Sequence, residues 1–443
     1  MHGEPASTAT WYGVRMVAEA ELKRFLVVSY EYSARIAGGS VRVVGFARHA
    51  PAFGWTASVV TATPAEDQPD ICDINVVTVP SVDGRFGGGI QATDDSGRLN
   101  PPGRLLRLLS PLKFWIPLER QALWLPRMLR QLGRQDTAGV RAVVVTSPPY
   151  VVLWAGRRLA RRIGVPLIVD LRDDWVDRFA IEKRSVLNRA LMHRFMNQML
   201  RSAEAIVVVS PDTQDRLIKA GYTVHWIPNG FDEDEFVDIA IDAPLIGGDG
   251  PLTVVHTGWL GGFRSCRPVL DAMARIVREQ GPRVDPVFRF KQMGLIDEHE
   301  IAVLAEVREG VDVVIEGQRS RTEAIKAMAT ADVLLVVPGT NIPAAVSGKI
   351  FEYYRARRPI LLVARTGAAT RLASEIGLRY VCAPDDVDGI VSILRELLEE
   401  KRNGTLRTRS STGGLERWER TNGARALADV LDSVAGSDGS AAT

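Results

Sequence analysis

Residues 142–171 read AVVVTSPPYVVLWAGRRLARRIGVPLIVDL, and this stretch decides the fold class. Short runs rich in Val and Ile lie at its two ends, and a segment of helical length connects them. Continuous apolar runs of this length are typical of strands that a parallel sheet buries on both faces. The order of strand, helix and strand therefore predicts an α/β fold with parallel strands.

The same alternation continues on both sides of this stretch. Apolar runs at 25–30 and 205–209 extend the first series, and a polar, Gly-rich stretch at 238–250 ends it. A second series follows, with strands expected near 252–257, 286–290, 311–315, 332–337 and 359–363. Two doubly wound, Rossmann-like domains follow from this pattern. The expected divisions are a polar tail over 1–21, an N-terminal domain over 22–236, a C-terminal domain over 237–405, and a loop with a terminal helix over 406–443.

Composition narrows the classes of function. The chain has 443 residues, 46% of them apolar, so disorder is excluded for most of its length. Its 55 Lys and Arg nearly balance 53 Asp and Glu, which gives no general electrostatic case for nucleic-acid binding. Three scattered cysteines favour neither disulfides nor a zinc site. With no signal peptide or membrane span in the pattern, we expect a cytoplasmic protein.

Each series opens in a similar way. The first strand of the first half leads into Gly38-Gly39 and a helix, and the first strand of the second half leads into a loop that starts at Gly258. Ser265 is expected to cap the helix that follows this second loop. Ligands of open α/β sheets bind at this edge, where helix N-termini offer free N–H groups to anions.

Cations accompany these helix starts. Arg42 lies in the first turn after the first loop, and Arg264 directly precedes Ser265. Lys349 repeats the arrangement in the stretch SGKIFEYY at 347–354. Arginines on helices are usually solvated, so each of the two has a plain surface interpretation as well. Together the three cations indicate a diphosphate held between the domains without a metal.

The stretch at 347–354 is the most informative. Ser347 is expected to be the N-cap, which places Lys349 in the first helical turn, where a cation opposes the helix dipole. An anion bound there would neutralise both the charge of Lys349 and the positive end of the helix dipole. Glu352 lies three residues further on, so a plain pair between Lys349 and Glu352 is the alternative.

Other polar groups allow two interpretations each. Asp170, Arg172, Asp173 and Asp174 end a strand, where a carboxylate could accept a hydrogen bond from the incoming acceptor hydroxyl. An Asp turn or N-cap tied to Arg172 is the alternative.

Similarly, Asp232-Glu233-Asp234 has the letters of a metal-binding DxD motif but follows an Asn-Gly turn, and we expect it to end a loop. His256 ends a strand beside the second loop, where a packed histidine is the alternative to a site residue. No metal site is expected.

Several motifs then match a known family. They are listed here in chain order: GGSVR at 38–42, SPP at 147–149, DLRDDW at 170–175, IPNGFD at 227–232, HTG at 256–258 and GKIFEY at 348–353. From about residue 25 to residue 434 the chain resembles GT-B glycosyltransferases, in particular glycosyltransferase family 4 and its bacterial surface-polysaccharide branch. The resemblance implies two Rossmann-like domains that face a cleft, and a C-terminal helix that crosses back to the first domain. It also implies transfer of a hexose-like sugar from a nucleotide-sugar, with retention and without a required metal or other cofactor.

The resemblance assigns roles to individual residues. Glu352 matches the carboxylate that binds the ribose hydroxyls, and Arg264 and Lys349 match cations near the diphosphate. Gly38 and Gly39 would let the backbone approach the same phosphates.

The candidate catalytic residues are therefore Arg264, Lys349 and Asp173. The candidate donor-binding residues are Gly38, Gly39, Arg42, Gly258, Arg264, Ser347, Gly348, Lys349 and Glu352.

Two positions depart from the family pattern. Ala344 stands where members commonly carry a second glutamate, and Leu153 where many carry a histidine. Two alternatives therefore stay open: a GT-B relative such as a nucleotide-sugar 2-epimerase or a sugar phosphorylase, and a non-catalytic scaffold that binds nucleotide-sugar.

Two segments carry further expectations. The helical pattern over 415–434 should cross back onto the first domain, with a hinge near 236–250. Residues 101–135 combine arginines with Leu and Trp, which favours docking on an anionic membrane surface at the inner membrane face. Alternatively, the Trp residues of this segment cover the core of the first domain. The expected acceptor is a glycan, a lipid-linked or a small molecule.

Overall fold

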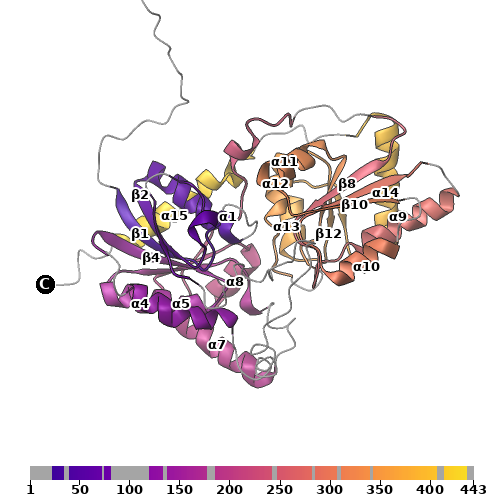
Figure 1. The fold of residues 1–443 in the computed structure, drawn as a ribbon. Helices are drawn as coiled ribbons and strands as arrows, with labels where there is room; N and C mark the ends of the chain where they lie inside the picture. The colour runs from indigo at the N-terminus through magenta and orange to yellow at the C-terminus, as the bar shows by residue number, and fades with distance from the viewer. Residues whose placement is uncertain are drawn as a thin grey trace, which may run out of the picture.

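The computed structural model describes residues 22–33, 39–71, 74–80, 119–132, 137–176, 185–241, 247–281, 285–306, 311–339, 343–406 and 414–436. They form two α/β units side by side, each a parallel sheet with helices on both faces (Figure 1). The expectation of two doubly wound parallel sheets is confirmed. We call the two units the first and the second domain.

The first domain has seven strands in the order β3-β2-β1-β4-β5-β6-β7. They are β1 (Lys23–Val28), β2 (Trp55–Thr61), β3 (Asn75–Thr78), β4 (Val140–Ser147), β5 (Leu167–Leu171), β6 (Ala205–Val208) and β7 (Val224–Trp226). One face packs on α4 (Leu125–Leu132), α5 (Val151–Ile163), α7 (Val186–Leu200) and α8 (Pro211–Lys219), and the other on α1 (Gly39–His49) and α15 (Arg420–Ala435). The helix expected after the first glycine loop is present as α1, and its apolar side chains Val43, Phe46 and Ala47 are buried.

The second domain has six strands in the order β10-β9-β8-β11-β12-β13. They are β8 (Leu252–Thr257), β9 (Phe288–Met293), β10 (Val311–Gly317), β11 (Val333–Val336), β12 (Ile360–Val363) and β13 (Tyr380–Cys382). The helices α9 (Arg267–Gln280), α10 (Glu298–Glu306) and α14 (Val387–Arg402) cover one face; α11 (Arg321–Thr330), α12 (Lys349–Arg355) and α13 (Ala368–Glu375) cover the other. The alternation of apolar runs did not predict β2, β3, β7 or β13.

Short 3-10 turns connect several elements: η1 (Ala50–Phe53), η2 (Ala65–Asp67), η3 (Arg120–Trp124), η4 (Glu233–Phe236) and η5 (Glu416–Trp418). Two of them, η4 and η5, lie where the chain passes between the domains. There the backbone N–H of Phe231 donates to Trp418 O at 3.1 Å, and that of Arg420 donates to Phe231 O at 2.8 Å. The outgoing and returning segments are therefore joined as a short parallel bridge.

The C-terminal helix crosses back as expected. In Figure 1 the yellow α15 lies beside α1, and Leu427 and Leu431 are buried in the core between α15, α1 and the first sheet. This burial stabilises a helix that would be marginal alone in water.

The arginine-rich segment is described only in part. Residues 101–118 and 133–135 lie outside the described residues, as do the tail over 1–21 and residues 242–246 of the expected hinge. Trp124 is buried, and its Nε1 donates to Val79 O at 2.6 Å. This tryptophan therefore covers the core of the first domain and does not face a membrane. Within the ranges given above, no helix has the length and apolarity needed to cross a bilayer.

Candidate functional site

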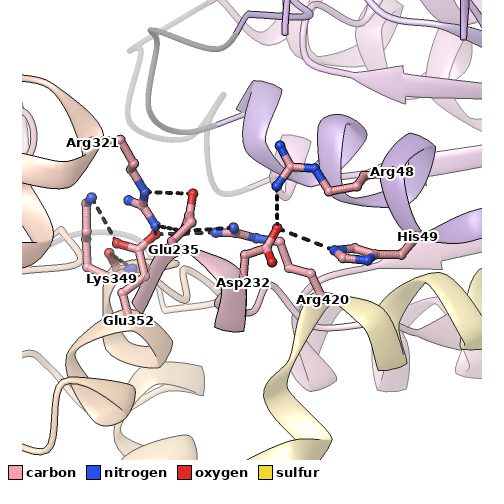
Figure 2. Close-up of polar contacts among 9 residues, drawn as sticks. Arg48, His49, Asp232, Glu235, Arg321, Lys349, Glu352 and Arg420 are labelled. Carbon is pink, nitrogen blue, oxygen red and sulfur yellow. Dashed lines mark hydrogen bonds and ion pairs between the residues drawn. The ribbon is translucent and has the colours of Figure 1, made fainter. Parts of the chain in front are cut away.

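Half-buried charged side chains surround the buried Glu352 on α12 (Figure 2). Arg321 Nη2 donates to Glu352 Oε1 at 2.8 Å, and Lys349 Nζ donates to Oε2 at 3.1 Å. A longer contact of 3.4 Å joins Arg420 Nη2 to Oε1. Both carboxylate oxygens thus have cationic partners, and the pair between Lys349 and Glu352 that the sequence offered as an alternative is present.

A second carboxylate completes this group. Glu235 on η4 receives two hydrogen bonds from Arg321, from Nε at 3.0 Å and from Nη2 at 2.6 Å. Arg420 Nη1 lies 3.4 Å from the same side chain. We call Glu235, Arg321, Lys349, Glu352 and Arg420 the Glu352 cluster. It holds three cations and two carboxylates, so it offers net positive charge.

Burial and charge act in opposite directions on the acids and bases of this cluster. Burial alone would raise the pKa of Glu352, but Arg321 and Lys349 hold the pKa well below its ordinary value. Burial lowers the pKa of Lys349, and Glu352 opposes that effect. Glu352 is therefore an ionised carboxylate throughout the ordinary pH range.

Lys349 stands at the start of α12, as expected. The helix begins at Lys349, and its N-cap is Gly348, not Ser347. Gly348 already has helical angles, and Ser347 Oγ accepts only a 3.4 Å contact from the N–H of Lys349. The expected cap was wrong by one residue. Gly258, at φ +118°, lies next to this lysine: a Cβ there would stand 3.5 Å from Lys349 Cε.

The end of β8 fixes the position of α12. Tyr353 Oη accepts a hydrogen bond of 2.8 Å from the N–H of Thr257. One residue earlier, the buried His256 pairs through Nδ1 with Gln292 Oε1 at 2.8 Å. Burial lowers the pKa of His256 to about 4, although Gln292 acts in the opposite direction. The imidazole is therefore neutral at pH 7 and can act only as a neutral donor or acceptor.

Arg264 faces the same region from the loop after β8. Its guanidinium stacks over the Phe263 ring at 5.0 Å and the Trp259 ring at 5.6 Å. Burial lowers its pKa, and Asp173 of the first domain opposes that effect. Both Arg264 and Lys349 also act on His256. Arg264 is thus the candidate catalytic residue that interacts with Asp173 of the first domain, and it shares with Lys349 an effect on His256.

The helix after Arg264 starts later than expected. Its N-cap is Cys266, not Ser265, and it begins at Arg267. The N–H of Cys266 donates to the buried Glu300 carboxylate at 3.2 Å, and Ser265 Oγ accepts from the N–H of Arg267, the first helical residue, at 3.2 Å.

Arg42 lies elsewhere, inside the first domain. It pairs with Asp170, with Nη2 3.0 Å from Oδ1, and it donates through Nη1 to Pro228 O at 3.0 Å. Thr146 Oγ1 donates to the same carboxylate at 2.9 Å. Both side chains of the pair are almost fully buried. Gly39 begins α1, and Gly38 is outside the described residues.

The remaining residues of the acidic run at 170–174 have separate partners. Asp174 accepts from the N–H of Val176 at 2.8 Å and from Arg216 Nη2 at 2.6 Å, so it caps a turn. Arg172 donates to the carbonyl oxygens of Ser147 and Pro148. Arg172 is therefore not the partner of Asp170, and Asp173 is the exposed carboxylate of the run.

The DxD-like letters belong to the connection between the domains. Asp232 accepts from Arg48 Nη1 at 3.0 Å and lies 3.4 Å from His49 Nε2 (Figure 2). Glu233 pairs with Arg355. Among the residues that the structure describes, no group of three His, Cys, Asp or Glu could hold a metal.

Four participants in this region were not predicted. Glu235, Arg321 and Arg420 come from segments that are far apart in the sequence, and only the fold brings them to Glu352. Glu31, after β1, is buried; burial raises its pKa, Arg172 opposes this, and Asp173 adds to it. An acid directly after a buried strand is a signal that could have singled out Glu31.

Comparison with known proteins gives the context of this geometry. Residues 37–230 match the glycosyl transferase 4-like domain. Many solved structures share the fold at low identity. A glycosyltransferase from Rickettsia africae has 11% identity and a TM-score of 0.60, with 95% of this chain and 100% of that chain covered. The chain has the GT-B fold of glycosyltransferases. A search of curated protein sequences gave no match.

Two further GT-B structures are similar over nearly their whole length. One is an alpha,alpha-trehalose-phosphate synthase (UDP-forming) from Burkholderia vietnamiensis, with 13% identity, a TM-score of 0.61, and 94% of this chain and 99% of that chain covered. The other is WaaG, a glycosyltransferase involved in lipopolysaccharide biosynthesis. It has 15% identity and a TM-score of 0.55, with 93% of this chain and 97% of that chain covered. The resemblance seen in the motifs is thereby confirmed.

The GT-B fold also places the two residues that depart from the family pattern. Leu153 on α5 is fully buried in the core beneath the first sheet. Ala344 lies in the loop between β11 and α12. Neither side chain offers a polar group, so polar contacts to a donor sugar must come from other side chains or from the backbone.

Proposed function

We propose that this GT-B protein is a retaining glycosyltransferase that moves a sugar from a nucleotide-sugar donor to an acceptor. One observation carries the proposal: Arg264, whose charge interacts with Asp173 of the first domain, and Lys349 both act on His256 at the end of β8. A diphosphate leaving group develops negative charge as the glycosidic bond breaks, and fixed cations in a partly dry site stabilise that charge.

The same site offers a place for the nucleotide. Glu352 would accept hydrogen bonds from the ribose hydroxyls, because a buried ionised carboxylate is a strong acceptor. Lys349 lies between this carboxylate and the backbone of Gly258, and it would contact the diphosphate. Gly258, Ser347 and Gly348 would let the donor approach the backbone closely.

On the acceptor side, Asp173 would receive the hydrogen bond of the incoming hydroxyl. We propose a glycan, a lipid-linked or a small-molecule acceptor, a cytoplasmic location with peripheral membrane contact, and a reaction that needs no metal. The neutral His256 would act as a hydrogen-bond partner in the cleft and not as a charge.

Binding is tested first. The melting temperature of the full chain is measured with each nucleoside diphosphate and with each of its sugar derivatives. The matching ligand should raise it, because a ligand at 100 times its dissociation constant adds about 2.7 kcal/mol of stability. The identified donor is then incubated with and without acceptors, with and without EDTA, and the anomeric configuration of the product is read by NMR.

The outcomes separate the alternatives. Release of nucleotide that requires an acceptor supports a transferase, whereas sugar isomerisation without an acceptor indicates a 2-epimerase. The scaffold alternative rests on Ala344 and Leu153. Binding of the nucleotide-sugar without any donor hydrolysis would support that alternative. Loss of activity in EDTA would contradict metal independence.

A further inference from the structure

Trp259 lies in the loop after β8, beside the two cations that the proposed function assigns to the diphosphate. Its indole is half-buried, and the Arg264 guanidinium lies over the ring, 5.6 Å from the ring centroid. The preceding residue, Gly258, is the one whose Cβ would stand 3.5 Å from Lys349 Cε. Among the described residues, the two apolar cores of the second domain do not include Trp259. This side chain is therefore not explained by the packing of the sheet.

Backbone hydrogen bonds fix the loop that carries Trp259. Gly261 and Arg264 exchange two of them: the N–H of Gly261 donates to Arg264 O at 2.9 Å, and the N–H of Arg264 donates to Gly261 O at 3.0 Å. Asp297 Oδ2 accepts from the N–H of Gly262 at 2.9 Å. A loop closed in this way holds its side chains in place before a ligand arrives, which lowers the entropy cost of binding.

Two glycines let aromatic rings lie against the backbone here. At Gly262 φ is +61°, and a Cβ there would stand 3.1 Å from Cη2 of Trp259. At Gly339, after β11, a Cβ would stand 2.7 Å from Cδ2 of Phe263. Phe263 in turn packs edge-on against Trp259, with 6.3 Å between the ring centroids. The positions of both rings therefore depend on the two glycines.

The charged groups of the site lie in an order that places the donor sugar near Trp259. Lys349 Nζ contacts Glu352, the proposed ligand of the ribose, at 3.1 Å (Figure 2). Arg264 lies over the Trp259 ring and is also the cation whose charge interacts with Asp173 of the first domain. In a nucleotide-sugar the diphosphate separates the ribose from the hexose. With the ribose at Glu352 and the diphosphate at Lys349 and Arg264, the hexose lies beyond the cations, toward Trp259 and Asp173.

We propose that Trp259 is a specificity-determining residue on which the hexose ring of the donor stacks. The inference rests on the proposed function and adds to it the recognition of the sugar. One face of a pyranose ring presents C–H groups that neighbouring oxygens polarise, and the negative face of an indole attracts such groups. Ala344 and Leu153 offer no polar side chain. Stacking on Trp259 supplies part of the binding that polar contacts at those positions would otherwise provide.

The test compares ligands that grow by one group at a time. The probes are UMP, UDP and UDP-glucose; GMP, GDP and GDP-mannose; and AMP, ADP and ADP-glucose. Calorimetric titration of the full chain gives the dissociation constant of each probe, and the series whose diphosphate binds most tightly is used for the comparison. In that series Trp259→Ala should weaken binding of the nucleotide-sugar about fivefold to twentyfold. The affinities for the monophosphate and the diphosphate should change less than about twofold.

Two further variants and a control isolate the aromatic ring. Trp259→Phe keeps an aromatic face and should retain most of the affinity for the nucleotide-sugar, whereas Trp259→Leu keeps only an apolar side chain and should behave like Trp259→Ala. Trp154→Ala is the matched control, because Trp154 on α5 is exposed and also carries an arginine, Arg158, at 5.8 Å from its ring centroid. It should bind all three probes as the natural chain does. The melting temperature of each variant without ligand shows whether it is folded.

Four results would overturn the proposal and leave the proposed function intact. An equal loss for all three probes would place Trp259 against the nucleobase. An equal loss for the diphosphate and the nucleotide-sugar alone would mean that Trp259 acts by orienting Arg264. Unchanged affinity of Trp259→Ala for the nucleotide-sugar, or natural affinity in Trp259→Leu, would mean that the hexose does not stack on the ring. A natural chain that binds none of the probes would instead contradict the proposed function, and this inference with it.

Discussion

The two domains open with the same local arrangement and use it differently. In each, the first strand leads into a loop with glycine, a helix and an arginine. In the first domain, Arg42 meets Asp170 at the end of β5 and is buried as an ion pair. In the second domain, Arg264 stacks on Phe263 and, among the described residues, pairs with no carboxylate. The partner, not the local pattern, decides whether such a cation is held in a buried ion pair.

The largest effect should come from exchanging the two arginines for apolar residues. Arg42→Met should lower the free energy of unfolding by about 3 to 5 kcal/mol, because it leaves the buried Asp170 carboxylate without its cation. Arg264→Met should change stability by less than about 1 kcal/mol and weaken donor binding instead. Denaturant unfolding and nucleotide titration of both variants check the contrast. Equal stability losses would remove the distinction between the two cations.

A compensated variant sharpens that result. Replacing both partners, Arg42→Met with Asp170→Leu, should restore part of the lost stability, because no unpaired charge then remains in the core. No recovery at all would mean that the loss in Arg42→Met came from packing and not from the charge of Asp170.

The next effect is a pH dependence that belongs to the second domain. The pKa of His256 is about 4 in the folded protein, against 6.5 for the free side chain. Below pH 6.5 His256 is protonated in the unfolded chain, but in the folded chain it stays neutral down to about pH 4. The free energy of unfolding therefore falls as the pH drops from about 6.5 to 4, by about 3 kcal/mol in all. Denaturant unfolding at pH 7 and pH 4.5 should show this loss in the natural chain and a smaller one in His256→Gln. The exposed His193→Gln should behave as the natural chain does.

In the Glu352 cluster, Lys349→Ala and Glu352→Gln should each weaken donor binding roughly tenfold to a hundredfold, or about 1.4 to 2.7 kcal/mol. Lys349 loses a cation for the diphosphate, and Glu352 loses its negative charge toward the ribose. Calorimetric titration with the identified nucleoside diphosphate measures both. Unchanged affinity with lowered thermal stability would support the plain ion-pair interpretation.

The smallest effect tests the connection between the domains. Arg420 contacts Glu352 at 3.4 Å from the start of α15, so Arg420→Gln should loosen that carboxylate and reduce the preference for a ribonucleotide over its 2′-deoxy counterpart about threefold to fivefold. Arg417→Gln is the matched control, since Arg417 pairs with Glu375 on the surface. The affinity ratio of the two nucleotides is the readout. A fall in both affinities with the ratio unchanged would assign Arg420 to general stability.

Much of the architecture was predictable because it depends on local periodicity. The apolar runs of β1, β4, β5 and β8 are continuous, and both faces of each sheet are covered, so the pattern and the fold coincide. The strand β13 has only three residues, and β2 carries Ser and Thr among its apolar positions, so neither stood out.

The candidate site was predictable only in its local part. Lys349 and Glu352 lie three residues apart and could be paired from the sequence. Arg321, Glu235 and Arg420 reach Glu352 from three other segments, and the partner of Arg42 lies 128 residues away. Contacts of this kind depend on topology, and no local propensity encodes them.

The return of α15 to the first domain has a consequence for biosynthesis. One face of the first sheet buries Phe25 and Val27 against α1 and against Leu427 and Leu431 of α15. A chain growing from the ribosome makes β1 before the whole second domain and makes α15 only after it. The second domain contains all its strands and covering helices within residues 252–402, so it can form its core first. The half of the molecule that is translated first is therefore the half that finishes folding last.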